Sequence, residues 1–196
     1  MVLSPHAAYE LWADTYPAVA HNPLMRIEQE NVEPLLESTG ASIVPGLDFS
    51  LAMLTRSAGR ARVCGDACHL PFRSASFDLV NASLMVGDIA DLAGWTREMA
   101  RVLTAGGHLV YSDFHPSWAR RGWSRTFRAA DGAEHDVSFN PHALDDHLMA
   151  LEQAGLRVLT VREPRFRDEA DPSIRAFRKR WGNPPVVVVF HAVKAP

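Results

Sequence analysis

Two aspartates, Asp48 and Asp66, are the residues whose type and position best suit ligand binding. Each follows a short run that reads as a β-strand and precedes a helix or a turn. Ligands of open parallel sheets sit beyond the carboxyl ends of the strands, where a carboxylate accepts hydrogen bonds from sugar hydroxyls. The alternative is that both are turn or cap residues, which aspartate favours because its side chain bonds nearby backbone amides.

His115 is the residue best placed to move a proton. It follows directly on a strand predicted at residues 108–114, at the end of the sheet where reactive groups gather. Histidine is a frequent general base because its ordinary pKa lies near neutrality. The alternative is a loop histidine before Pro116, and the sequence favours neither interpretation.

Metal and disulfide chemistry are not expected. Cys64 and Cys68 are the only cysteines, and two thiols without a further ligand pair fall short of a zinc site. We expect both to be buried thiols in a reducing cytoplasm. Residues 117–140 hold arginines that suggest an anionic substrate, but their alternation with aromatic residues favours an exposed hairpin with one packed face.

The N-terminal region is predicted to form a helical lid. Residues 5–37 carry apolar side chains at helical spacing, with a restart where Asn22 can cap a helix and Pro23 takes its first position. Pro34 should end this second helix near Glu33 or begin one short further turn there.

The rest of the chain alternates predicted strands and helices. Strands are expected at 43–47, 62–64, 77–83, 108–114, 157–162 and 186–193, and helices at 50–57, 92–103 and 142–154. Gly106 and Gly107 should stop the helix before them, residues 117–140 should form a hairpin or flap, and 164–185 an Arg-rich loop. The pattern predicts an α/β protein with a doubly wound, mostly parallel sheet and an antiparallel last strand.

Composition indicates one domain. The chain has 196 residues, of which 47% are hydrophobic and 22% charged, and a net charge of −3. This balance gives no electrostatic reason to bind nucleic acid or an anionic membrane. The sequence has neither an apolar stretch of membrane-spanning length nor a secretory signal pattern at residues 1–12, so we expect a cytoplasmic protein.

Three stretches together form a specific pattern. They read VPGLDFSLAML, VCGDACHLPFRSASFDLVNASL and EMARVLTAGGHLVYSDFHP. Their acidic strand end, Gly-Asp pair, LPF, FDLV and GG turn resemble the class I S-adenosylmethionine-dependent methyltransferases, and within them the methyltransferase type 11 group. The resemblance covers residues 40–116 closely and the rest in outline. It implies a Rossmann-like sheet with a lid at 1–37, a cofactor-side core at 41–116, a flap at 117–140 and the remaining sheet at 141–196.

The resemblance also implies a site. Asp48 would accept the ribose hydroxyls of S-adenosylmethionine, and Asp66, with the Ala67 amide beside it, would contact the adenine. The residues implied to bind the cofactor are Tyr16, Asp48, Phe49, Asp66, Ala67, Ser83 and Leu84. His115 would be the base for a small-molecule acceptor, because a hydroxyl or amine must lose a proton as it is methylated.

One part of the family pattern is absent. In the family, a strand, a turn of the form Asp/Glu-x-Gly-x-Gly-x-Gly and a helix precede the strand that ends at Asp48. Here only residues 37–42 separate the second helix from that strand, whereas a strand-helix-strand unit needs about 30 residues. Losing several backbone donors of this kind should weaken cofactor binding about a hundredfold or more.

The absent strand would lie in the middle of the sheet. The strand at 43–47 is therefore expected to close up against the strand at 77–83, to remain an edge, or to pair with another molecule, which makes a homodimer possible. A degenerate paralogue, a rearrangement that still binds the cofactor and a gene deletion all fit the sequence. The two functional hypotheses are a methyltransferase and a non-catalytic binding or assembly protein that has kept the fold.

Overall fold

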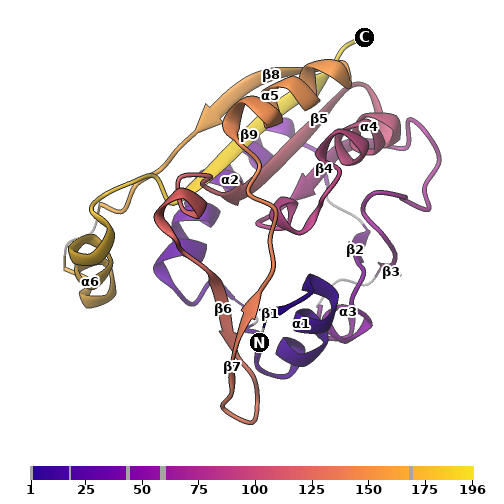
Figure 1. Ribbon diagram of the computed structural model, residues 1–196. Helices are drawn as coiled ribbons and strands as arrows, with labels where there is room; N and C mark the ends of the chain where they lie inside the picture. Colours follow the sequence, from indigo (N-terminus) through magenta and orange to yellow (C-terminus); the bar gives the residue numbers. More distant parts are fainter. Residues whose placement is uncertain (1, 18, 43–44, 58–60, 168–169) are drawn as a thin grey trace.

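A computed structural model describes residues 2–17, 19–42, 45–57, 61–167 and 170–196. Its main sheet has four strands in the order β4-β5-β9-β8 (Figure 1). These strands are β4 (Phe77–Ala82), β5 (Leu103–Phe114), β8 (Leu156–Arg162) and β9 (Val187–Lys194). β4 runs parallel to β5, and β9 runs antiparallel to both β5 and β8. The α/β class and the antiparallel last strand are confirmed.

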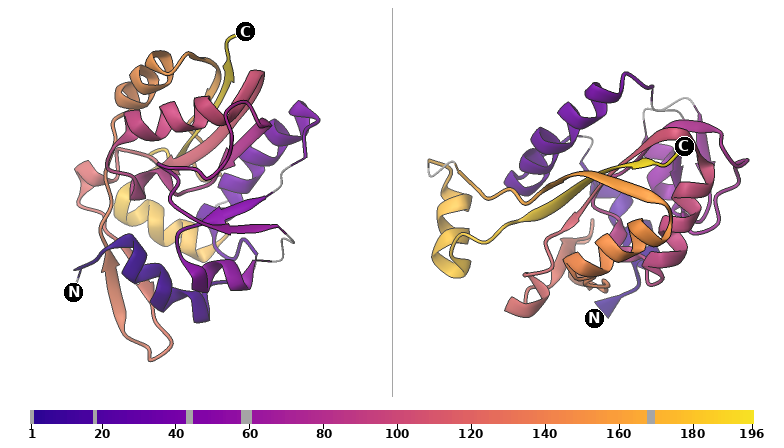
Figure 2. Two further views of the ribbon diagram at one scale, coloured as in Figure 1. Left: turned by 90° about the vertical axis from the view of Figure 1, so that its right-hand side faces the viewer. Right: turned by 90° about the horizontal axis from the view of Figure 1, so that it is seen from above.

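Helices cover both faces of this sheet. Figure 2 shows α2 (Pro23–Thr39) on one face and α4 (Leu92–Val102) with α5 (Leu144–Gln153) on the other. The main core lies between the sheet and the α4/α5 layer, where Trp95, Tyr111 and Phe190 have no exposed surface. Such aromatic side chains bury large apolar areas, and their burial stabilises this core.

The sheet is divided into two parts on the β4 side. β2 (Gly46–Asp48) and β3 (Arg62–Cys64) form a separate parallel pair. Among the described residues, β2 pairs with β3 and β4 pairs with β5, but β2 and β4 do not pair with each other. The expected closure against the strand at 77–83 is therefore not found among the described residues, where β2 keeps one edge without a strand partner; pairing with another molecule stays a prediction. Residues 43–44 of the strand predicted at 43–47 lie outside the described residues.

A third sheet joins the N-terminus to the flap. β6 (Arg125–Arg128) and β7 (Glu134–Val137) form the predicted hairpin, with Gly132 in its turn at φ +85°. β1 (Val2–Leu3) adds parallel to β7. α1 (Pro5–Trp12) and the 3-10 turn η1 (Ala13–Thr15) follow β1, and the Trp12 ring stacks on Phe127 with a centroid distance of 5.1 Å. The N-terminal helices therefore lie against the flap.

The predicted start of α2 is confirmed, but its predicted end is wrong. The Asn22 side chain accepts a hydrogen bond from the Met25 amide at 2.9 Å. The helix then continues through Pro34 to Thr39. Pro34 is exposed, while Val32 and Leu35 beside it are buried against the sheet. Packing of that apolar face outweighs the one backbone hydrogen bond that proline removes.

The two glycines after α4 act differently from the prediction. The helix already ends at Val102, and β5 begins at Leu103. Phe77 and Leu79 are two positions apart in β4. Their partners in β5, Leu103 and His108, are five positions apart. Gly106, at φ +76°, therefore allows a bulge within the strand, a conformation that residues with a Cβ disfavour.

The region predicted as an Arg-rich loop contains a helix, α6 (Pro172–Trp181). Asp171 caps it by accepting from the Ser173 amide at 2.8 Å, and Pro172 takes the first position. The signals of a helix start were present in the sequence, but the many charged residues concealed them. Residues 168–169 lie outside the described residues.

The remaining elements agree with the predictions. They are the short helix α3 (Leu51–Arg56), the helix α5 and the strands β8 and β9. Two 3-10 turns were not predicted, namely η2 (Val86–Asp88) and η3 (Ala119–Arg121). The burial expected for the cysteines is wrong, because Cys64 is exposed and Cys68 only half-buried. Within the described ranges, no helix combines the length and apolar character needed to cross a bilayer.

A buried carboxylate fixes the connection after β4. Asp113, near the end of β5, accepts hydrogen bonds from the Gly87 amide at 3.1 Å and from the Phe114 amide at 2.8 Å. Gly87 lies so close that a Cβ there would meet the Asp113 carboxylate at 3.2 Å. Burial raises the pKa of Asp113 to about 7, although the two amides oppose the shift.

Pro34→Ala should stabilise the protein. Alanine restores the hydrogen bond from position 34 to the Glu30 carbonyl, and we expect the free energy of unfolding to rise by about 1–3 kcal/mol. Urea denaturation at an unchanged m-value measures the effect. Pro23→Ala is the matched control, because the first helical position has no such bond to regain. Equal effects of the two substitutions would contradict the helical placement of Pro34.

Asp113→Asn should change the pH dependence of stability. The folded-state pKa near 7 exceeds the unfolded value of about 3.9, so wild-type stability falls as pH rises through this interval. The variant does not titrate there and keeps an oxygen that accepts from Gly87. Between pH 4 and pH 8, its free energy of unfolding should gain about 2–4 kcal/mol relative to wild type. If the free energies of unfolding of wild type and variant differ by the same amount at every pH, Asp113 is not a buried carboxyl that titrates in this range.

Candidate functional site

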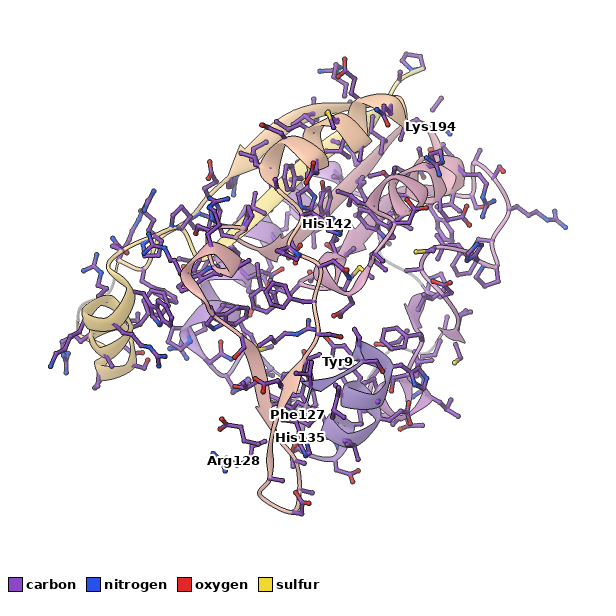
Figure 3. All side chains as sticks on the ribbon, in the orientation of Figure 1. Tyr9, Phe127, Arg128, His135, His142 and Lys194 are labelled. Atoms are coloured by element: carbon purple, nitrogen blue, oxygen red, sulfur yellow. The ribbon has the colours of Figure 1, made fainter. Side chains whose placement is uncertain are left out.

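Two cavities adjoin each other at the carboxyl ends of β2 and β4. The first, the inter-sheet cavity, has a volume of about 320 Å³ and lies between β2 and β4. The second, the aromatic cavity, has a volume of about 670 Å³ and lies between the N-terminal helices, the flap and α6. Tyr9 and Tyr16 line both cavities and therefore form their common wall. Figure 3 shows Tyr9, a residue of α1, and its ring lies 5.9 Å from the guanidinium of Arg125 in the flap.

Asp48 lines the inter-sheet cavity. Its Oδ1 accepts from the Ser50 amide at 2.8 Å, and Ser50 in turn caps α3 by accepting from the Met53 amide at 3.1 Å. The Ser50 hydroxyl also donates to Glu10 of α1 at 2.6 Å, so the lid and the β2 end are connected. Burial raises the pKa of Asp48, and the neighbouring carboxylates of Asp88 and Glu10 add to this rise.

Most of the residues expected to bind a cofactor share this cavity. Its lining includes five of the seven, namely Tyr16, Asp48, Phe49, Ala67 and Ser83. The Phe49 ring lies 5.9 Å from the Tyr9 ring in an edge-on arrangement. Burial raises the pKa of Tyr16, with the Asp48 charge adding to the effect, so its phenol stays protonated. These residues come from the position directly after η1 and from the ends of β2, β3 and β4.

The other two expected residues lie elsewhere. Asp66 is not among the residues that line either cavity. Its side chain is 60% exposed and contacts the Cys68 amide at 2.8 Å and His69 Nδ1 at 3.0 Å. Leu84 lines the aromatic cavity instead. It adopts φ +52°, which is rare for a branched side chain, and its amide donates to the Ser112 carbonyl at 3.1 Å.

His115 is removed from both cavities. Its Nε2 contacts Glu163 at 2.8 Å, and its Nδ1 contacts the Ser117 hydroxyl at 2.8 Å. Its amide donates to the Val186 carbonyl at 3.2 Å, and the residue is only 8% exposed. With both ring nitrogens engaged, His115 connects β5 to the segments around residues 163 and 186. The expected role as a base therefore has no geometric support among the described residues.

A buried ion pair at the junction of the cavities was not predicted. Asp88 of η2 pairs with Arg125 of β6, and the two side chains are only 2% and 6% exposed. Asp88 lines the inter-sheet cavity and Arg125 lines the aromatic cavity. The Arg125 guanidinium lies 5.9 Å from the ring centres of Tyr9 and Phe114. Burial raises the pKa of Asp88, an effect that Arg125 opposes without cancelling it.

Tyr9 is tied to this pair. Burial raises the pKa of its phenol, and the negative charge of Asp88 raises it further. Tyr9 therefore remains a neutral hydrogen-bond donor at the boundary between the two cavities. The only sequence signal for the ion pair was an acidic residue after Gly87 and an arginine in the flap, which no local rule connects.

The aromatic cavity is apolar. Its lining includes two of the three tyrosines, two of the five tryptophans and four of the nine phenylalanines. The two arginines that line it both have acidic partners, because Arg125 pairs with Asp88 and Arg128 with Glu134 at 3.1 Å. The cavity therefore offers a flat, apolar molecule aromatic surfaces and little net charge.

Comparison with known proteins agrees with this geometry. Residues 29–111 match the protein family described as Methyltransferase domain. The demethylmenaquinone methyltransferase of Mycolicibacterium gilvum is 43% identical over 81 residues, which are 40% of this chain. The chain spans only 35% of the length of that relative.

Two solved structures share the fold. An S-adenosylmethionine-dependent methyltransferase of Mesorhizobium loti superimposes with a TM-score of 0.60 at 23% identity, covering 76% of this chain and 79% of the other. The N-methyltransferase NodS of Bradyrhizobium japonicum, solved with S-adenosyl-L-homocysteine, superimposes with a TM-score of 0.65 at 14% identity. The superposition covers 99% of this chain and 100% of the other. Residues 29–111 thus match a methyltransferase domain, and the chain shares the fold of these two methyltransferases.

Proposed function

We propose that the chain is an S-adenosylmethionine-dependent methyltransferase that acts on a small, uncharged, apolar acceptor. The observation that carries the proposal is the pair of adjoining cavities with Tyr9 and Tyr16 in their common wall. A donor in one cavity and an acceptor in the other would meet across these two phenols. Holding two reactants in line is the main requirement of a displacement reaction.

The residues of the inter-sheet cavity fit a nucleoside cofactor. A carboxylate at the β2 end, Asp48, suits ribose hydroxyls, and the Phe49 ring suits an adenine face. The buried Asn81 Oδ1, which also lies in this cavity lining, has no hydrogen-bond partner among the described residues and can accept from an amine or hydroxyl. The bound cofactor would supply an electrophilic methyl group on sulfur. The chain's own residues would bind it and orient the acceptor.

The ion pair and Tyr9 define the acceptor side. With its charge neutralised by Asp88, Arg125 does not select an anion, and the aromatic lining favours a flat apolar molecule. Asp88, whose pKa is raised by burial, would accept the proton that a hydroxyl or amine loses on methylation. The relatives named as demethylmenaquinone methyltransferases support a small-molecule acceptor.

A non-catalytic binding protein is the second candidate. It is favoured by the division of the sheet beside the cavity and by the six residues 37–42, which hold no glycine-rich turn that would donate to a cofactor carboxylate. Cofactor binding distinguishes the two candidates, because only the methyltransferase requires it.

Asp48→Ala should weaken cofactor binding. Loss of charge-assisted hydrogen bonds should raise the Kd for S-adenosyl-L-homocysteine about ten- to a hundredfold, as measured by isothermal titration calorimetry. Asp66→Ala, the matched control outside the cavity lining, should change the Kd less than about threefold. Equal losses of affinity in both variants would indicate that Asp66 also belongs to the cofactor site. A folded wild-type chain that binds no S-adenosyl-L-homocysteine would contradict the proposal and support the non-catalytic candidate.

The aromatic cavity should prefer neutral probes. We expect wild type to bind 2-naphthol at least about fivefold more tightly than 2-naphthoate in a tryptophan-fluorescence titration, since a carboxylate finds no unpaired cation there. Asp88→Asn leaves Arg125 unpaired and should reverse this preference, provided that near-ultraviolet circular dichroism shows a native fold. Glu134→Gln frees only the exposed Arg128 and should leave the preference unchanged. A wild-type preference for 2-naphthoate would rule out an uncharged acceptor.

A further inference from the structure

The charged side chains that line the inter-sheet cavity are acidic. Its lining contains two carboxylates, Asp48 and Asp88, and no lysine, arginine or histidine among the described residues. Besides burial, the negative charges of Asp88 and Glu10 raise the pKa of Asp48. The three carboxylates therefore lie near enough to repel one another, and a positive charge placed beside them would relieve that repulsion.

Arg125 does not reverse this charge. It lines the aromatic cavity instead, and its charge is matched by that of Asp88, with which it pairs. Neither Asp48 nor Glu10 has an ion-pair partner in the part of the chain that the structure describes. The inter-sheet cavity therefore keeps a negative charge after the Asp88–Arg125 pair is counted.

The donors at the start of α3, directly beyond β2, already hold a carboxylate of this chain. The Ser50 hydroxyl donates to Glu10 at 2.6 Å. This hydrogen bond lowers the pKa of Glu10 most, and the amides of Ala52 and Leu51 lower it further. Backbone amides at a helix start are a usual place for a ligand carboxylate, and here Glu10 takes that place.

Two buried oxygen atoms in the cavity lining have no hydrogen-bond partner among the described residues. They are Asn81 Oδ1 and Asp88 Oδ2, and the Asp88 side chain is only 2% exposed. Both atoms accept hydrogen bonds, so a ligand group that satisfies them must donate. Trp95 Nε1 is an unpartnered buried donor in the same lining, but it is a single neutral N–H. An ammonium group brings three donors and a positive charge, and it suits this lining better than a carboxylate does.

We propose that the inter-sheet cavity selects adenosyl ligands whose side chain carries an ammonium group and no carboxylate. The inference rests on the proposed binding of a nucleoside cofactor in this cavity. The amino-acid end of S-adenosylmethionine carries both groups. Its ammonium would meet Asp48 and Asp88, whereas its carboxylate finds no cation in the lining. Removal of the carboxylate should therefore strengthen binding, although it weakens binding wherever a glycine-rich turn donates to that group.

Three thioethers test this selectivity on the full chain by isothermal titration calorimetry at pH 7.5. S-adenosyl-L-homocysteine carries both charged groups, S-adenosyl-3-thiopropylamine lacks only the carboxylate, and 5′-deoxy-5′-methylthioadenosine lacks both. We expect the amine to bind at least about fivefold more tightly than S-adenosyl-L-homocysteine, because it avoids repulsion by the cavity carboxylates. It should also bind more tightly than the ligand that lacks both groups, since only the amine brings a cation.

A pair of variants tests whether the cavity charge is the cause. Asp88→Asn removes one carboxylate from the lining and leaves Arg125 unpaired, so the preference for the amine should shrink at least about threefold. Asp78→Asn is the matched control, because Asp78 lies on the same strand β4, is exposed and is not among the lining residues. It accepts from the Thr104 hydroxyl at 2.8 Å, a bond that asparagine can keep, and the preference should change less than about twofold.

The possible failures are distinguishable. If none of the three thioethers binds to the folded wild-type chain, the proposed cofactor site is wrong and this inference falls with it. If they bind, but S-adenosyl-L-homocysteine binds as tightly as the amine or more tightly, only the selectivity is overturned. Equal shifts in Asp88→Asn and Asp78→Asn would contradict a cavity origin of the preference. If Asp88→Asn fails to fold, the three ligands on the wild-type chain still decide the question.

Discussion

The absence of backbone hydrogen bonding between β2 and β4, among the described residues, is the constraint on which the rest of the structure depends. A parallel sheet is stable because every interior strand pairs on both sides, and here that continuity is interrupted. The four strands from β4 to β8 keep a core of their own, built with α4 and α5. β2 and β3 contact α3, which in turn contacts α1 and η1. The interruption thus divides the molecule into a well-packed part and a smaller part, with the inter-sheet cavity between them.

The candidate site lies where these parts meet. Asp48 comes from the smaller part, Asp88 from the turn after β4, and Arg125 from the flap. The Asp88–Arg125 pair therefore joins the sheet to the flap in a place where neither charge meets solvent. Breaking such a pair leaves an uncompensated buried charge, which costs about 3–5 kcal/mol. The same pair keeps the aromatic cavity near electrical neutrality, so one interaction connects stability with the proposed preference for an uncharged acceptor.

Local signals in the sequence predicted much of the fold. The Asn22 cap, the hairpin turn at Gly132 and the strands around Asp48 follow from short-range rules, and the structure contains them. The continuation of α2 through Pro34 did not follow, because burial of Val32 and Leu35 decides it. The Asp88–Arg125 pair spans 37 positions, and His115 is held by Glu163 at a separation of 48. Such contacts between distant segments have no signature in a single sequence, so the site was predicted only in part.

Amide hydrogen exchange, followed residue by residue with NMR on the isolated chain, tests the interrupted sheet most directly. If the Leu47 N–H faces an empty edge, it should exchange at least about a hundredfold faster than the amides of Leu109 and Val110 in the centre of β5. The Asp48 amide, which belongs to the set of β2 groups that face β3, serves as the neighbour for comparison. Protection of Leu47 equal to that of β5 would show that β2 pairs on both sides, and would contradict the account.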